Sequence, residues 1–411
     1  MSLLTDFDIA TDLKVEFYIP NVSLNAFIIG VSELGGSNVL PIAGVFFVGS
    51  SLLGGSDVLG GSGFDWQDLG CETSQLESEL GGQVENVTYF QPQSAEALIQ
   101  LQSYSYDPTN NRTVRPGTPI RARVSRGGVD QILFRGYLDT IDVSYTVDGP
   151  NLITIKAFDS FKRVMNTRLA TFDTTSGFPG YATPLEVAEK IAVGFGTTMN
   201  ALSAATIGRI PSDYQTDVIP NTLLNEAIKV GLAFFWIDPV TEEFVFIPRP
   251  TTAAAPGGTY TIGNSHEDSF HLCMSDLVVA ADSDDVYNSL RVSLESDSAT
   301  YVIREDVASI ELYGTAAIDV SINTTDSDQL DIWADKVFTQ SPTRLVQSVQ
   351  TPAVDRSGNL THAAAIYPGE VVGVKYETTD MSIDTYYSVT KVSHSIDVNN
   401  WFTTLELWKE V

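Results

Sequence analysis

The side chains best suited to hold a metal ion lie in one segment, His266-Glu-Asp-Ser-Phe-His271-Leu-Cys273. On an extended strand, His271 and Cys273 would point to the same face. An imidazole and a thiolate are ligands that zinc accepts, although this spacing matches none of the common zinc sites. We therefore interpret the segment as a solvated sheet edge with a buried thiol, and we predict no bound metal and no cofactor.

A second candidate site is the acidic run of Asp282, Asp284 and Asp285. Clustered carboxylates can bind calcium, but this run lacks the glycine and the distal glutamate of an EF-hand loop. A solvated turn explains the same residues without an ion. We favour the turn and keep calcium as the alternative.

Motifs for catalysis are missing. The chain has no GxSxG, HExxH or Walker sequence, and no GxGxxG opens a helix. Phe234, Phe235 and Trp236 could form a platform for a sugar, but their place after a helix favours core packing. We predict no catalytic residue, and hence a protein that is not an enzyme.

The charge balance limits the partners. The 411 residues carry 52 acidic and 23 basic side chains, a net charge of −29. Such a surface repels phosphate, which argues against sequence-specific binding of nucleic acid. Two interpretations remain: a surface that aids solubility, or a negative wall past which a polyanion moves without adhering. The 43% hydrophobic content excludes a wholly disordered chain.

The two cysteines and the first residues indicate the compartment. Cys71 and Cys273 are far apart and form no CxxC pair, so neither a disulfide framework nor a structural zinc site is indicated. The apolar residues at the start follow no basic segment, which argues against a secretory signal. We expect synthesis in a cytoplasm.

The hydrophobic periodicity indicates a mainly β chain with an α+β middle section. Apolar and polar residues alternate over 120–124, and further strands are expected over 131–143 and 152–159, before a short helix over 160–165. In the middle, Thr183-Pro184-Leu185-Glu186 is typical of a helix start. A second helix from Asn221 leads into a hairpin over 234–247.

The last third is predicted to contain strands and one helix. Strands are expected over 286–293, 301–303 and 310–313, followed by a helix around Leu330 and Trp333. Four more strands follow over 345–350, 370–376, 386–394 and 401–408, which is the spacing of a meander or small barrel.

A tandem repeat with an offset of 19 residues precedes these elements. Residues 27–40 align with residues 46–59, each copy being an apolar strand, a Gly-Gly turn and an apolar return. The glycines argue against a membrane helix and favour hairpins that dock on a neighbouring subunit. Any membrane contact is expected only through residues 27–59. The expected subunit-interface residues are Phe27, Ile29, Leu34, Phe46, Val48 and Leu53.

The order of the strands resembles that of phage tail hub proteins. The resemblance rests on GTPIRARV at 117–124, LFRGYLDTI at 133–141 and ITIKAFD at 153–159. It continues in the helix and hairpin of 221–249, in DDVYNSLRVS at 284–293, and in the closing strands of 368–377 and 386–407. Counted from Ala95 to the closing strand at Leu407, the resemblance covers about three quarters of the chain. The tandem repeat lies outside the pattern.

This resemblance implies a structural virion protein at the tail tip of a siphophage, a baseplate hub or minor tail protein. It implies a homotrimer with two tube-like antiparallel β-barrel domains, which lines an acidic channel for DNA ejection. The expected units are an N-terminal strand with the Gly-rich hairpin insertion (1–68), a first β-domain (69–170), an α+β domain (171–258) and a second β-domain with one helix (259–411).

The expected partners are further copies of the chain, a distal tail or tail tube protein above it, and a tip, fibre or tape-measure protein below it. Two alternatives are a tail-associated cell-wall hydrolase and an envelope-penetrating tip protein. A hydrolase would have to be built from the middle section, which shows no nucleophile and base pattern.

Overall fold

The computed structural model describes residues 9–20, 64–68, 71–85, 89–104, 114–126, 128–173, 181–201, 208–211, 214–249, 260–264, 271–280, 287–325, 327–338, 345–355, 359–398 and 400–409. The tandem repeat, with its six expected interface residues, lies outside this part of the chain, as do His266 and the run from Asp282 to Asp285.

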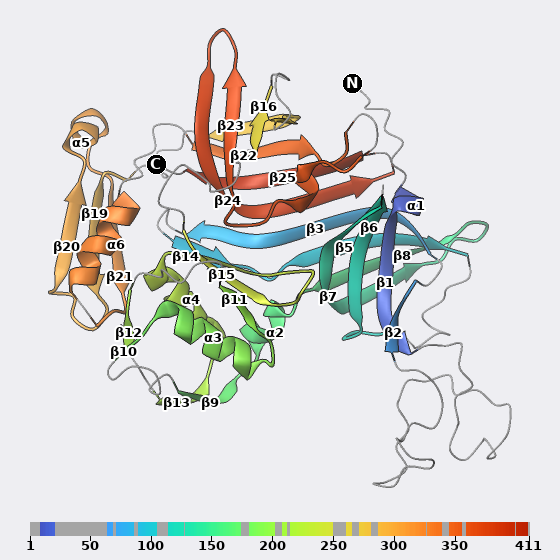
Figure 1. Cartoon of the computed structure of the whole chain (residues 1–411), viewed down its shortest axis with the longest axis horizontal. Helices are drawn as coiled ribbons and strands as arrows, with labels where there is room; N and C mark the ends of the chain where they lie inside the picture. Colours follow the sequence, from blue (N-terminus) through green and yellow to red (C-terminus); the bar gives the residue numbers. More distant parts are fainter. Residues whose placement is uncertain are drawn as a thin grey trace.

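One 15-stranded sheet forms the centre of the molecule (Figure 1). Its main path has the order β17-β16-β23-β24-β3-β5-β8-β7-β6-β1-β2, and β25, β22 and β18 continue from β24. The N-terminal strands are β1 (Leu13–Pro20), β2 (Phe64–Asp68), β3 (Glu72–Glu85), β4 (Tyr89–Pro92), β5 (Glu96–Ser103), β6 (Pro119–Arg126), β7 (Val129–Ser144) and β8 (Asn151–Phe158). The C-terminal strands are β16 (Thr261–Gly263), β17 (His271–Cys273), β18 (Asp276–Ala280), β22 (Leu345–Pro352), β23 (Val371–Glu377), β24 (Ser382–Asp397) and β25 (Asn400–Lys409).

The alternating pattern of the sequence explains the sheet. In β6, Ile120, Ala122 and Val124 are buried while the residues between them are partly exposed. The expected strands at 131–143, 152–159, 345–350, 370–376, 386–394 and 401–408 all lie within strands of this sheet or overlap them closely. The mainly β fold class is therefore confirmed.

The strands of the two expected β-domains, 69–170 and 259–411, pair directly with each other. Leu76 to Gly81 of β3 pair antiparallel with Ile396 to Lys391 of β24. The two expected separate barrels are not confirmed, because the described strands of both units form one open sheet that does not return on itself. One hydrophobic core accordingly spans both units, with buried residues from β3, β5, β6, β8, β24 and β25.

A mixed unit packs against one end of this sheet. It contains α2 (Phe161–Asn166), α3 (Pro184–Gly194), α4 (Pro220–Gly231), the hairpin of β14 (Ala233–Ile237) and β15 (Phe244–Pro248), and the short strands β9 (Leu169–Asp173), β10 (Tyr181–Ala182), β11 (Met199–Ala201), β12 (Ile210–Pro211) and β13 (Tyr214–Val218). The predicted start of α3 is confirmed: the Thr183 hydroxyl accepts from the Glu186 backbone, and the Glu186 carboxylate accepts from the Thr183 backbone. Phe234, Phe235 and Trp236 are buried, so their predicted role in the core is also confirmed.

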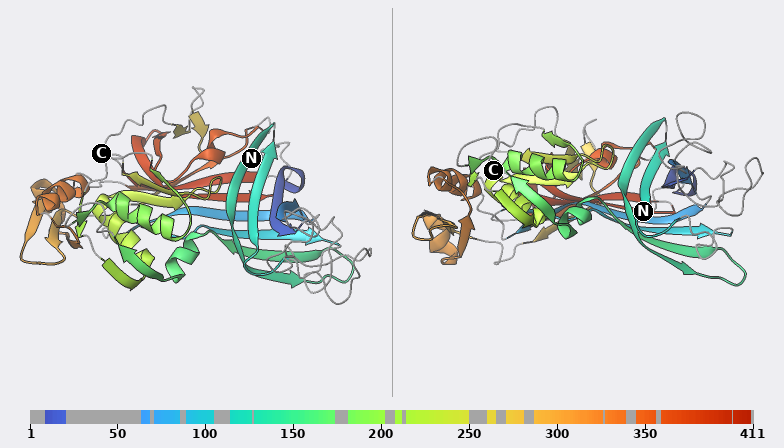
Figure 2. Two further views of the ribbon diagram at one scale, coloured as in Figure 1. Left: turned by 60° about the horizontal axis from the view of Figure 1, so that its bottom comes forward. Right: turned by 90° about the horizontal axis from the view of Figure 1, so that it is seen from below.

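A small unit lies at one end of the long axis (Figures 1 and 2). It contains β19 (Ser289–Leu294), β20 (Tyr301–Glu305), α5 (Val307–Tyr313), β21 (Ala317–Ile322) and α6 (Asp328–Phe338). The strand predicted over 310–313 is wrong, because these residues form the end of α5. The described part of 259–411 thus has two α-helices where one was predicted, in addition to the 3-10 turn His362–Ala365. Asp306 caps α5 by accepting from the Ser309 backbone, and Gly314 ends it.

The remaining N-terminal element is the short helix α1 (Ile9–Asp12). Its Ile9 is buried in the core of the sheet. Among the described residues, no helix has both the length and the apolar character needed to span a membrane.

Candidate functional site

One polar face extends across strands β18, β22, β25, β24, β3, β5, β8 and β7, and we call it the acidic face. Residues directly opposite one another on paired strands point to the same side of a sheet. One row across the strands is Asp276, Gln350, Thr404, Ser393, Glu79 and Glu96. A second row is Phe402, Ser395, Glu77, Leu98, Lys156 and Thr140, and a third is Gln75, Gln100, Thr154 and Asp142.

The opposite side of the same strands is apolar. Leu76, Ile99 and Ile155 are fully buried there, and Val392 and Leu405 continue the core into the C-terminal strands. The period of two therefore places the exposed polar residues of these strands on one continuous surface, while a few polar residues, such as Ser78 and His394, are buried on the opposite side. This surface crosses the joint between β3 and β24 without interruption.

Negative charge dominates the acidic face. Its carboxylates include Glu77, Glu79, Glu96, Asp142, Asp276 and Glu406. The two lysines are both held by carboxylates: Lys391 Nζ lies 2.6 Å from Glu79 and 3.6 Å from Glu406, and Lys156 Nζ lies 2.6 Å from Glu96. No ammonium in the described part of this face is thus left to hold a phosphate.

The arginines near the other end of the sheet are also neutralised. Glu16 of β1 is buried and accepts from Arg121 Nε at 2.7 Å and from Arg123 at 3.2 Å. Arg123 also binds Asp130 at 2.9 Å, and Arg126 pairs with Asp12. These pairs keep the positive charges of β6 in contact with carboxylates.

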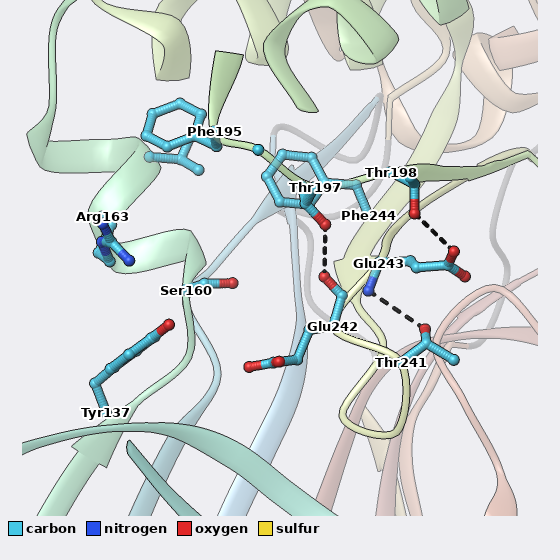
Figure 3. Close-up of a pocket in the computed structure, with 12 residues that line it drawn as sticks. Tyr137, Ser160, Arg163, Phe195, Thr197, Thr198, Thr241, Glu242, Glu243 and Phe244 are labelled. Atoms are coloured by element: carbon cyan, nitrogen blue, oxygen red, sulfur yellow. Dashed lines mark hydrogen bonds between the residues drawn. The ribbon is translucent and has the colours of Figure 1, made fainter. Parts of the chain in front are cut away.

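A cleft of about 370 Å³ lies between the sheet and the mixed unit (Figure 3). Tyr137, Ser160 and Arg163 line one side, and Glu242 and Glu243 line the other. The lining contains neither histidine nor cysteine.

The two glutamates of this cleft are already bonded. The Glu242 carboxylate lies 2.6 Å from Arg135, and the Glu243 carboxylate accepts from the Thr198 hydroxyl at 2.7 Å. Glu242 is thus held by a guanidinium, and Glu243 by a threonine hydroxyl to which the lining of the cleft adds no histidine or lysine as a catalytic base.

Three buried titratable groups lie away from the acidic face. Burial raises the pKa of Asp159 to about 6, although hydrogen bonds from the Ser94 hydroxyl (2.7 Å) and the Phe161 backbone (3.1 Å) oppose the shift. Burial likewise raises the pKa of Glu370 to about 7 and lowers the pKa of His394 to about 4. The last two lie at the base of β23 and within β24, where they affect stability.

The residues of the expected metal segment are only partly described. Cys273 is exposed at the end of β17, so the expected buried thiol is wrong at this position; Cys71 is half-buried, and burial raises the pKa of its thiol. The described residues contain no group of three or more histidine, cysteine or acidic side chains arranged to hold a metal.

The sequence analysis did not predict the acidic face. The signal was present in ETSQLESEL at 72–80, where Glu77 and Glu79 alternate with Leu76 and Leu80. That alternation indicates one wet face, but only the pairing of β3 with β24 and β5 shows that the wet faces of distant segments join.

Comparison with known proteins gives matches at the level of structure. No protein-family model and no curated protein matches the chain. A tail protein from Neisseria meningitidis superposes with a TM-score of 0.57 at 14% identity, covering 85% of this chain and 94% of that one. The 43 kDa tail protein of prophage MuSo2 from Shewanella oneidensis gives 0.55 at 11% identity, with 84% and 95% covered. The prophage tail protein gp18 from Listeria monocytogenes gives 0.50 at 11% identity, with 83% and 91% covered.

The chain therefore has the fold of phage and prophage tail proteins. The resemblance expected from the order of the strands is confirmed at this level. The proteins it resembles are described as tail proteins and not as enzymes.

Proposed function

We propose that the chain is a structural component of a phage tail that assembles as a trimeric hub at the tail tip, with its acidic face lining the channel for DNA. The observation that carries this proposal is the continuous acidic face, in which the two lysines are paired with carboxylates. The shared fold with tail proteins supports the same assignment.

The charge of the face suits a conduit. DNA that moves through a channel must not adhere to the wall, and attraction to phosphates depends on free Lys and Arg side chains. Repulsion between the carboxylates and the phosphates acts over a Debye length of about 8 Å at physiological salt. An acidic face would therefore keep the duplex away from the wall in a narrow channel.

The remaining parts of the proposal concern organisation and neighbours. The chain would comprise the units 1–68, 69–170, 171–258 and 259–411, and contact a distal tail or tail tube protein above and a tip, fibre or tape-measure protein below. Residues 27–59 would dock on neighbouring subunits through Phe27, Ile29, Leu34, Phe46, Val48 and Leu53. We propose no enzymatic role.

Cysteine labelling tests whether the acidic face is enclosed. In a Cys273→Ser background, Ser395→Cys places a thiol in the middle of the acidic face, and Val193→Cys places one on α3, where Val193 is 72% exposed. Two reagents are compared at the highest soluble protein concentration: a small maleimide, and a maleimide attached to a polymer of about 5 kDa. The polymer is too bulky to enter a narrow gap of about one Debye length. The background protein with Cys71 alone gives the baseline.

We expect the small reagent to label both thiols and the large reagent to label only Val193→Cys. In denaturant, both thiols should react with both reagents. Equal labelling of Ser395→Cys by the large reagent in the native protein would contradict an enclosed acidic face.

A further inference from the structure

The small unit exposes large apolar side chains on α5 and on the edge strand β20, where Arg291 stacks on the ring of Tyr301 at 4.4 Å. Helix α5 has no buried residue, although its sequence is VASIELY. Together with the edge strand β20 it exposes large apolar side chains. We call these the apolar tip: Tyr301, Ile303, Val307, Leu312 and Tyr313, each between 47% and 76% exposed. A seven-residue helix is marginal without packing, so a covering partner would stabilise it.

The rim of the apolar tip carries unpaired negative charge. Glu305 and Glu311 are exposed, and neither has a cationic partner among the described residues. The nearby Arg304 does not neutralise them, because it binds Asp331 at 2.8 Å and Asp335 at 2.6 Å on α6. A surface that covers the tip should therefore be apolar with basic groups at its edge.

A candidate surface for covering the apolar tip lies along α2. The cleft of Figure 3 adjoins a second cleft of about 460 Å³, and Tyr137 and Arg163 line both clefts. We call the two together the α2 groove. Its apolar lining is Leu138, Phe158, Val164, Phe195 and Phe244; Phe158 and Phe195 are partly exposed, and the other three are buried beneath the surface. Clefts of 300–1,000 Å³ are the usual size for holding ligands or inserted side chains.

The basic groups of the α2 groove differ in their pairing. Lys162 is bound to Asp139 at 3.1 Å and Arg135 to Glu242 at 2.6 Å. Arg163 is exposed and contacts the ring of Tyr137 at 5.5 Å, but no described carboxylate pairs with it. Arg115, beside the groove residue Pro116, is exposed and lacks such a partner as well in the described part of the chain.

We propose that the apolar tip of one copy of this chain docks in the α2 groove of the next copy, with Glu311 and Glu305 facing Arg163 and Arg115. Within one copy, α5 lies at one end of the molecule and α2 near its centre, apart in both views (Figures 1 and 2). Two different surfaces that fit each other make a head-to-tail contact, which closes into a ring when the rotation allows it. The inference rests on the proposed multi-copy assembly, for which it names the contact.

Charge reversal across the contact tests this docking. The variants are Arg163→Glu, Glu311→Arg and their combination, with Lys14→Glu on the exposed side of β1 as the control of equal charge change. Leu312→Asp removes the apolar part of the contact. All these side chains are exposed, so each variant should keep the wild-type melting temperature, which is measured first. Light scattering over a range of protein concentrations then gives the dissociation constant.

We expect Arg163→Glu, Glu311→Arg and Leu312→Asp each to raise the dissociation constant about tenfold or more. The combined charge reversal should return it to within about threefold of the wild type, and Lys14→Glu should leave it unchanged. Unchanged association in the single variants, a combination as weak as its weaker parent, or a wild-type monomer at every concentration would each overturn the docking.

The labelling experiment separates this outcome from the proposed function. If Ser395→Cys is protected while the charge reversals have no effect, the channel stands and the contact lies elsewhere. If the reversals act as expected but Ser395→Cys is open to the large reagent, the copies associate through the tip and the groove without enclosing the acidic face.

Discussion

Replacement of Gly81 by alanine tests the joint between the two β-units. Gly81 lies in β3 opposite Lys391 of β24, and its φ is +119°, a conformation that side chains with a Cβ rarely adopt. A Cβ added there would meet the carbonyl oxygen of Thr390 at 2.2 Å and the Cα of Lys391 at 3.0 Å. Both atoms belong to the backbone of β24, so they can move away only if the paired strands separate.

The expected cost follows from these two effects. The unfavourable φ alone costs about 1 kcal/mol or slightly more. The overlap with the β24 backbone adds about 2 kcal/mol, as in other overpacked sites. Gly128→Ala is the matched control, because Gly128 has a φ of +80° and nothing within 4 Å of the added Cβ. Gly128→Ala should therefore cost only the roughly 1 kcal/mol that comes from the unfavourable φ.

Thermal unfolding followed by circular dichroism measures the difference. At 2–4 °C for each kcal/mol, Gly81→Ala should lower the melting temperature by roughly 6–12 °C and Gly128→Ala by roughly 2–4 °C. Equal shifts for the two variants would refute a tightly packed joint between β3 and β24.

Three further predictions concern charged groups. Burial keeps the pKa of Glu370 at about 7, so the folded chain binds its proton more tightly than the unfolded chain; Glu370→Gln should be more stable than the wild type by about 2 kcal/mol at pH 8, and the difference in melting should shrink below about pH 7 and be gone at about pH 4. The pKa of His394 lies at about 4, below its ordinary value, so the wild type should lose up to about 1.4 kcal/mol per pH unit between pH 6.5 and 4, a slope that His394→Phe should lack in urea titrations. Lys391→Ala leaves Glu79 and Glu406 without their shared ammonium, so it should cost about 1 kcal/mol at low salt and clearly less in about 0.5 M salt; a cost independent of salt would argue against an electrostatic role.

Individual helices and strands could be predicted from the sequence, because their signals lie within a short stretch of chain. The start of α3 depends on four adjacent residues, Thr183 to Glu186, and the strands of 119–158 depend on alternation within eight to sixteen residues. Signals of this kind are complete within a short stretch of chain. The strand predicted over 310–313 was wrong because the cap at Asp306 and the stop at Gly314 were not used.

The acidic face could not be predicted, because it depends on pairing between distant segments. Glu79 and Ser393 are directly opposite each other although more than 300 residues separate them in the chain. Alternation tells which residues of a strand are wet, but not which strand lies beside it. The unpaired state of Arg163 is likewise a property of the packed structure, since it requires the positions of all neighbouring carboxylates.

The most direct test of the account is single-particle electron microscopy of the purified full chain at high concentration. The account predicts a closed ring of three copies in which the strands β3, β24 and β5 turn the carboxylates of Glu77, Glu79 and Glu96 towards the central channel. A ring with these strands on its outer surface, or a protein that stays monomeric, would contradict it.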